Sequence, residues 1–428
     1  MLSSFSKNIQ TTLITSFFSS LIYACTIPYL IIYLASIFSK ETLGLLVMIN
    51  VVSSFFSGII GGYLADNFQR KNVLFVFQTL YGVSLLLVAL NFSGILSQHY
   101  WLISGYLVCG MTYNLYSSAF NAVLLDSTIQ HERKKVYQLQ YWTFNLSMAL
   151  GASIGGFLFK NYLVYLFFGA AFLQFIVSGY LQKNLNYSNN ISKSKGRTIF
   201  HDLFTNYYTA AKDKRWVILI LGFALYSAAE FSLQNYTGIR LSKEFKPFSI
   251  FSITIDGVRM LSLLQVINTF MVVFFTFIVS KLTEKIRERS VVIIGLFIYI
   301  SGYGLMASAN SIYLLIPLMI LATLGELASA PILSARQVDL IPEDKQASYL
   351  SFSSLSFQGS QLLAAVGLTL GGYLTAGLIS GYIIILGVAG IYFVVSSLYG
   401  AEKNLVTNKT VIFYPELAST NFFQYYKS

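Results

Sequence analysis

Two glutamates stand inside long apolar runs, where an ionised side chain is costly. Glu230 lies within residues 217–236 and Glu326 within residues 314–333. An acid at the centre of a membrane helix costs roughly 2.5–3.5 kcal/mol on insertion scales, so it usually has a task. A carboxyl group removed from water binds a proton more readily. We expect these acids to pick up and release protons, with a cation competing for the same carboxylate. The alternative is a glutamate that only hydrogen-bonds a neighbour for packing.

The composition indicates that lipid, rather than water, surrounds most of the chain. Of its 428 residues, 55% are hydrophobic and only 11% are charged, against about 25% charged in soluble domains. Cys25 and Cys109 both lie in apolar runs and there are three histidines, so a disulfide framework or a metal centre is not expected. We predict an all-α membrane protein that needs no cofactor.

Apolar stretches long enough to cross a membrane recur along the whole chain. A span needs about 20 mostly apolar residues, and the first stretch is too long for a signal peptide. We expect twelve transmembrane helices, at residues 11–36, 43–65, 72–93, 101–124, 138–160, 162–181, 216–236, 260–281, 290–308, 312–334, 348–370 and 373–399.

The basic residues supply the expected topology. Most of the 28 Lys and Arg residues fall in alternate loops, as the positive-inside rule requires when both termini are cytoplasmic. This placement explains the net charge of +11 without nucleic acid as a partner. We expect a multi-pass protein of a bacterial plasma membrane that acts as a monomer.

Two halves of the chain resemble each other. In each half an Asp, Asp126 or Asp339, precedes a polar loop and a helix that ends in Gly-Gly. Such weak symmetry is typical of transporters built from related halves. We predict an N-terminal six-helix bundle (1–181), a cytoplasmic linker (182–215), a C-terminal six-helix bundle (216–399) and a cytoplasmic tail (400–428).

The loop between the second and third expected spans gathers charge in a short turn. It reads GGYLADNFQRK from Gly61 to Lys71. Such charges can form bonds in one conformation and break them in another, or they can simply anchor the topology. The segment resembles the loop motif of the major facilitator superfamily, G-x-L-A-D-R-x-G-R-[RK]-x-x-L, although Asn67 and Gln69 depart from it.

Further segments resemble LmrP-like secondary multidrug transporters of that superfamily. They are Tyr113-Asn-Leu-Tyr, Gln140-Tyr-Trp, Asn145-Leu-Ser, Gly257-Val-Arg-Met and Leu324-Gly-Glu with Ala330-Pro331. The resemblance implies two pseudo-symmetric six-helix bundles and multidrug efflux, with lipophilic, often cationic compounds leaving the cell in exchange for protons. Antibiotic resistance is the corresponding phenotype.

The chain departs from these relatives at acids that they use. Gln140 and Gln234 stand where LmrP-like proteins have acids, and an amide cannot titrate. Glu230 lies one helical turn before Gln234, so the titratable group has moved along the helix, or fewer protons are exchanged, or transport is uniport. Tyr106 in place of an intramembrane Arg and Ala152 in place of a Pro also weaken the drug/proton antiporter reading.

Charged residues at the ends of the expected spans form a candidate conformational gate. Near the membrane interface such charges are equally well explained as solvated surface or as snorkelling anchors. The candidates are Gly62, Asp66, Arg70, Lys71, Asp126, Arg133, Arg259, Arg336 and Asp339.

Aromatic side chains are abundant, with 36 Phe and 30 Tyr. Most belong to interfacial belts and lipid-facing surface, but aromatic rings beside a carboxylate suit lipophilic cations. The candidate substrate-cavity residues are Gln140, Tyr141, Trp142, Asn145, Tyr226, Gln234 and Asn235. Lipid or a hydrophobic peptide fits the same wall.

Other mechanisms lack a signature in the sequence. It contains no nucleotide-binding loop, so ATP does not drive the chain directly, and no nucleophile–base pattern predicts an enzyme. We expect a secondary exporter whose partners are small lipophilic molecules, protons and membrane lipids. A lipid or lipopeptide flippase on the same fold and a non-transporting membrane sensor are the alternatives.

Overall fold

Long helices make up most of the computed structural model, which describes residues 5–129, 132–186, 207–250, 253–342 and 345–400. A backbone inside hydrocarbon must satisfy its own hydrogen bonds, and a helix does so within one segment. Within those ranges, nine helices are long and apolar enough to cross a membrane. The helices form two compact units, which we describe separately.

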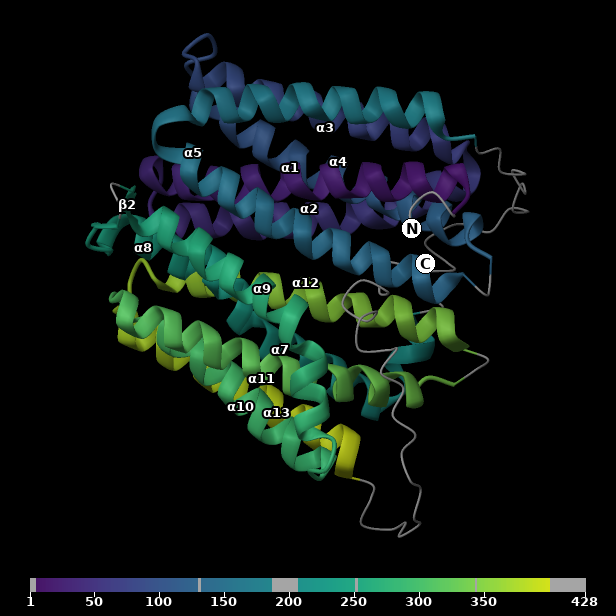
Figure 1. Ribbon diagram of the computed structural model, residues 1–428, viewed down its shortest axis with the longest axis vertical. Helices are drawn as coiled ribbons and strands as arrows, with labels where there is room; N and C mark the ends of the chain where they lie inside the picture. Colours follow the sequence, from purple (N-terminus) through teal and green to yellow (C-terminus); the bar gives the residue numbers. More distant parts are fainter. Residues whose placement is uncertain (1–4, 130–131, 187–206, 251–252, 343–344, 401–428) are drawn as a thin grey trace. The chain divides into compact units, whose positions relative to one another are not determined.

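The first unit contains the described residues up to Ser36 and those from Leu46 to the end of the fifth helix. Within it, α3 packs against α4 and α5, and these helices run side by side in Figure 1. Its helices are α1 (Lys7–Ile37), α2 (Lys40–Asn67), α3 (Arg70–Phe92), α4 (His99–Ser127) and α5 (Arg133–Asn184).

The second unit contains Ile37–Leu45 and the described residues from Tyr207 onward. Here α7 packs against α12 and α13, and α10 packs against α11. The elements are α7 (Lys214–Ser232), the π-helix η2 (Leu233–Thr237), α8 (Gly238–Glu244), the hairpin β1 (Phe248–Ile250) and β2 (Ile253–Ile255), α9 (Gly257–Thr283), α10 (Glu288–Met306), α11 (Ile312–Asp339), α12 (Gln346–Leu370) and α13 (Ala376–Tyr399).

Every expected span coincides with these helices over nearly its whole length, which confirms the predicted all-α fold class. Two of them, 138–160 and 162–181, lie in α5, whose 52 residues are broken at Tyr162 by non-helical backbone angles (φ −132°, ψ 25°). The span predicted at 216–236 continues from α7 into η2. Most of the predicted linker and nearly all of the predicted tail, residues 187–206 and 401–428, lie outside the described residues.

Glycines allow close packing of α5 on α1 in the first unit. A Cβ added to Gly155 would lie 2.1 Å from the ring of Tyr29, and one added to Gly151 would lie 2.6 Å from the Cβ of Ala24. Tyr29 is fully buried, and its hydroxyl donates to the carbonyl of Ala152 at 2.5 Å. Gly151 and Gly155 therefore serve helix packing.

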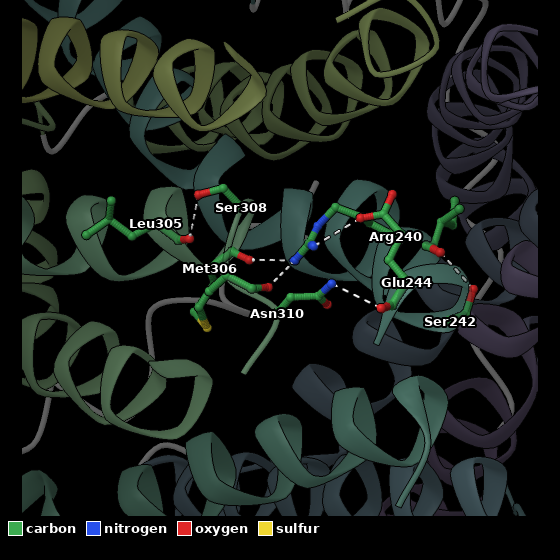
Figure 2. A network of polar contacts seen from close by, with 9 residues as sticks. Arg240, Ser242, Glu244, Leu305, Met306, Ser308 and Asn310 are labelled. Atoms are coloured by element: carbon green, nitrogen blue, oxygen red, sulfur yellow. Dashed lines mark hydrogen bonds and ion pairs between the residues drawn. The ribbon is translucent and has the colours of Figure 1, made fainter. Parts of the chain in front are cut away.

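A buried arginine fixes α8 to the end of α10 in the second unit (Figure 2). Arg240 is only 2% exposed. Its Nη2 donates to the carbonyls of Met306, at 3.3 Å, and Ala309, and its Nη1 lies 3.4 Å from a carboxylate oxygen of Glu244. The carbonyl end of a helix attracts a cation, and several acceptors compensate the buried charge. Arg240 thus has a structural role.

The glycine contact predicts a stability effect. Gly155→Ala should lower the melting temperature of the purified protein by several degrees, because overpacking a tight contact costs about 1–3 kcal/mol. The matched control is Gly169→Ala on the same helix, where an added Cβ meets nothing within 4 Å. Equal melting temperatures for the two variants would contradict the packing role of Gly155.

Candidate functional site

Glu230 lies in the last turn of α7, where a buried tyrosine donates to it. The hydroxyl of Tyr299, from α10, donates to Glu230 Oε2 at 2.9 Å. Tyr299 is 2% exposed, whereas Glu230 is partly exposed. The carboxylate therefore has one fixed neutral donor and one side open to another group.

Glu326, on α11, is held by an amide from α9. Asn268 Nδ2 donates to Glu326 Oε2 at 3.2 Å and also to the hydroxyl of Thr323 at 3.1 Å. The Thr323 hydroxyl in turn donates a hydrogen bond to the carbonyl of Met319, at 2.9 Å. This chain of hydrogen bonds fixes the Asn268 amide so that its NH₂ group, and not its oxygen, faces the acid.

A close helix contact brings the two carboxylates into one neighbourhood. A Cβ added to Gly325 would lie 2.4 Å from the carbonyl of Gly295 and 2.6 Å from the amide nitrogen of Tyr299. The backbones of α10 and α11 therefore touch beside Glu326 and Tyr299. Glu230 lies within electrostatic range of Glu326.

Aromatic rings surround the two acids. Tyr299 makes edge contacts with Tyr226 (centroids 5.9 Å apart) and Tyr303 (4.9 Å). All three tyrosines lie within electrostatic range of both carboxylates. Among the described residues, neither glutamate forms an ion pair with a basic side chain. Two acids compensated only by neutral donors can bind a proton or another monovalent cation, because either one relieves their mutual repulsion.

The helix changes its spacing directly after Glu230. The π-helix η2 begins at Leu233 and contains two of the predicted cavity residues, Gln234 and Asn235. Gln234 is partly exposed and Asn235 is buried. Short π-segments inside α-helices are frequent at functional sites. The expected amides therefore lie next to the carboxylates in the same unit, as does Tyr226.

The other predicted cavity residues lie on α5, in the first unit. Gln140, Tyr141 and Asn145 are partly exposed, and Trp142 is 49% exposed. Asn145 Nδ2 donates to the carbonyl of Tyr141 at 3.0 Å, so one donor of this amide is used inside the helix.

Two of the predicted gate residues pair within the first unit. Arg70, the first residue of α3, forms an ion pair with Asp126 near the end of α4. Its Nε also donates to the carbonyl of Ala65 at the end of α2, at 3.0 Å. Of the other candidates in this unit, Gly62 and Lys71 are partly exposed, while the side chains of Asp66 and Arg133 lie outside the described part of the chain.

The second unit has an ion pair at the matching place with its charges exchanged. Glu288 is the first residue of α10, as Arg70 is of α3. Arg336, near the end of α11, donates from Nε and Nη2 to Glu288 Oε2 at 2.8 and 2.6 Å. Asp339, the neighbouring gate candidate, is exposed. Each ion pair therefore joins two helices of one unit.

Arg259 at the start of α9 is tied to its own hairpin. Its backbone N–H is capped by the side chain of Asp256, at 3.0 Å, and its guanidinium donates to the carbonyl of Thr254 on β2. These contacts fix the entry into α9.

Sequence reasoning missed the neutral partners of the acids. Tyr299 and Asn268 carry no charge, and nothing in an apolar run distinguishes them from other polar residues. Glu288 lies between two arginines in a charged loop, where solvated surface is the default expectation. The spacing along a helix could have revealed one polar neighbour, because Thr323 lies one turn before Glu326.

Comparison with known proteins places this arrangement in a family. Residues 12–255 and 248–411 match the model of the family described as Major Facilitator Superfamily. The chain belongs to the major facilitator superfamily. It is therefore a multi-pass membrane transporter and not an enzyme.

Its relatives within the superfamily are distant. The chain is 21% identical over 378 residues to a protein of Planococcus maritimus named "Na(+), Li(+), K(+)/H(+) antiporter", covering 85% of this chain and 89% of that protein. It is 22% identical over 339 residues to the "Uncharacterized MFS-type transporter YttB" of Bacillus subtilis (strain 168), covering 76% and 78%.

Solved structures of the superfamily share the fold. A peptide transporter POT in complex with sulfate has a TM-score of 0.70 at 16% identity, covering 93% of this chain and 94% of that chain. The nucleoside transporter NupG has a TM-score of 0.67 at 14% identity, covering 91% and 99%.

The Glu288–Arg336 pair leads to a charge-exchange test. Glu288→Arg alone should lower the melting temperature, since it places like charges side by side, and adding Arg336→Glu should restore much of the loss. A coupling energy of about 1 kcal/mol is expected for a partly exposed pair. Asp339→Asn is the matched control and should change little. A double variant no more stable than its single parents would show that the pair contributes nothing.

Proposed function

We propose that the protein is a secondary exporter of lipophilic, cationic compounds that exchanges them for protons by alternating access. The observation that carries this proposal is the pair Glu230 and Glu326. Both acids lie inside membrane helices, and among the described residues both are held by neutral donors and by no basic side chain. The resemblance to LmrP-like transporters supports the choice of cargo.

Competition for these carboxylates couples the two fluxes. In one state Glu326 carries a proton and loses most of its attraction for a cation. Release of the proton leaves an anion that keeps the donor of Asn268 and can attract a cation over the ring of Tyr226. Since the second carboxylate, Glu230, adds negative charge nearby, the site favours a monovalent cation or protons over an empty state.

The ion pairs at the helix ends support movement of each unit as a rigid body. Arg70–Asp126 and Glu288–Arg336 each tie helices of one unit together. We place these helix ends, and both termini, on the cytoplasmic side, in agreement with the distribution of basic residues. Alternating access in this superfamily is rocking of one bundle against the other, which requires units that keep their internal packing.

A second candidate cargo is a bare monovalent metal ion. The neighbourhood of the acids offers oxygen atoms as ligands, from the two carboxylates, Thr323 and the tyrosines, and hard cations prefer oxygen. The relative from Planococcus maritimus is named as an antiporter of Na⁺, Li⁺ and K⁺. Export of such ions uses the same coupling with a smaller cation.

The main proposal predicts the loss of coupled efflux in Glu326→Gln. In proteoliposomes with an imposed pH gradient, wild type should expel a lipophilic cationic dye, and a protonophore should stop it. Glu326→Gln should reduce efflux to the level of empty vesicles, because the amide keeps the shape of the acid but cannot titrate. Glu230→Gln should remove the dependence of efflux on the pH gradient.

The control and the alternatives use the same vesicles. Glu284→Gln changes an exposed glutamate just after α9 and should leave efflux intact. Proton release driven by NaCl or KCl, without dye transport, would select the metal-ion cargo. If Glu326→Gln transports the dye at the wild-type rate, the proposed role of the carboxylate is contradicted. Absence of flux for every cation tested would reject the proposed function.

A further inference from the structure

Four tyrosines from three helices cluster inside the first unit. Tyr23 comes from α1, Tyr81 from α3, and Tyr113 and Tyr116 from α4. The ring centroids lie 4.9 Å apart for Tyr23–Tyr113, 5.3 Å for Tyr113–Tyr116, and 6.1 Å from Tyr81 to each of the two α4 tyrosines. The four rings form one continuous aromatic cluster, which we call the tyrosine cluster.

The tyrosine cluster has a buried part and an accessible part. Tyr81 and Tyr116 are 0% and 3% exposed, and their hydroxyls have no hydrogen-bond partner among the described residues. The Tyr116 hydroxyl approaches that of Ser19, but the two do not reach hydrogen-bond geometry. Tyr23 and Tyr113 are partly exposed. Leaving buried hydroxyls unpaired costs free energy, so packing alone does not explain tyrosine, rather than phenylalanine, at these positions.

Two tyrosines of the cluster occupy positions that carry the acids in the second unit, and a third matches Tyr299. Lys7 is the first residue of α1 and Lys214 is the first residue of α7. Tyr23 follows Lys7 by the same number of residues as Glu230 follows Lys214.

The same correspondence holds for the other two helix pairs. Tyr81 lies as far from Arg70 as Tyr299 lies from Glu288. Tyr116 precedes Asp126 by the same number of residues by which Glu326 precedes Arg336. One arrangement of three helices thus carries two carboxylates and a tyrosine in the second unit and three tyrosines in the first.

We propose that the tyrosine cluster is a second cargo-binding subsite, which takes the flat aromatic part of an organic cation. The accessible rings of Tyr23 and Tyr113 offer their faces and edges to a planar ring or to a delocalised positive charge. Behind them, the buried hydroxyl oxygens of Tyr81 and Tyr116 are acceptors that can face a positive charge. No acid lies near these rings on α1, α3 or α4, so this subsite selects cargo by shape and polarisability and carries no proton. The inference rests on the proposed function and adds a determinant of cargo class to it.

Equilibrium binding to the purified full-length protein tests the subsite. The probes are ethidium, a planar aromatic cation, and methylammonium, a compact and strongly hydrated cation without rings. Tyr23→Leu and Tyr113→Leu should each weaken ethidium binding by about tenfold, the loss of one ring contact, and leave methylammonium binding unchanged. Tyr23→Phe keeps the ring and should bind ethidium within about twofold of wild type. The matched control is Tyr33→Leu, a partly exposed tyrosine farther along α1 whose ring contacts Phe92 at 4.6 Å.

The outcomes separate this inference from the proposed function. Equal ethidium binding by wild type and both leucine variants would overturn the subsite while leaving carboxylate-coupled export intact. Equal weakening of both probes, or the same loss in Tyr33→Leu, would also overturn it, since it would show general damage to the unit. Selective loss of ethidium binding in a protein whose efflux ignores the pH gradient would support the subsite and reject proton coupling. A wild type that binds no ethidium would overturn the subsite, whereas the proposed function is tested by the efflux assay.

Discussion

The second unit depends on one constraint: it holds two carboxylates within membrane helices, and no basic side chain in the described part of the chain pairs with them. An acid in this position is tolerated only if its surroundings compensate it. Tyr299 and Asn268 do so by donating hydrogen bonds to Glu230 and Glu326. The touching glycines of α10 and α11, Gly295 and Gly325, make that arrangement possible by letting the helices approach. In the proposed mechanism, the negative charge that remains uncompensated favours binding of a proton or a cation, because either one neutralises it.

The two units use one framework for different chemistry. Each joins the start of its third helix to the end of its fourth helix by an ion pair, with Arg70 and Asp126 in one unit and Glu288 and Arg336 in the other. Elsewhere on the matching helices, the two acids of the second unit, Glu230 and Glu326, correspond to tyrosines of the first unit. A fold built from related halves can therefore assign charge recognition to one half and ring recognition to the other. Rigid-body rocking requires that each half keep its internal packing as it moves.

The sequence revealed the features that carry a charge or form a long apolar run. Glu230 and Glu326 stood out because they interrupt apolar runs, and the spans followed from length and composition. The break of α5 at Tyr162 lies between the two spans expected there. By contrast, Tyr299 is one of 30 tyrosines, and only tertiary packing shows that it faces an acid. The π-helix after Glu230 has no composition that distinguishes it from an α-helix. Arg240 lies between two expected spans, where nothing in the sequence indicates burial, whereas the fold buries it against the carbonyls at the end of α10.

Proton release on cation binding measures the central claim most directly. Purified protein in a weakly buffered detergent solution near neutral pH should acidify the medium when a transported cation is added, because the cation displaces protons from Glu230 and Glu326. The variant with glutamine at both positions should release none. Binding of the cation to wild type with no change in proton uptake would contradict the account, since cargo and proton would then not share a site.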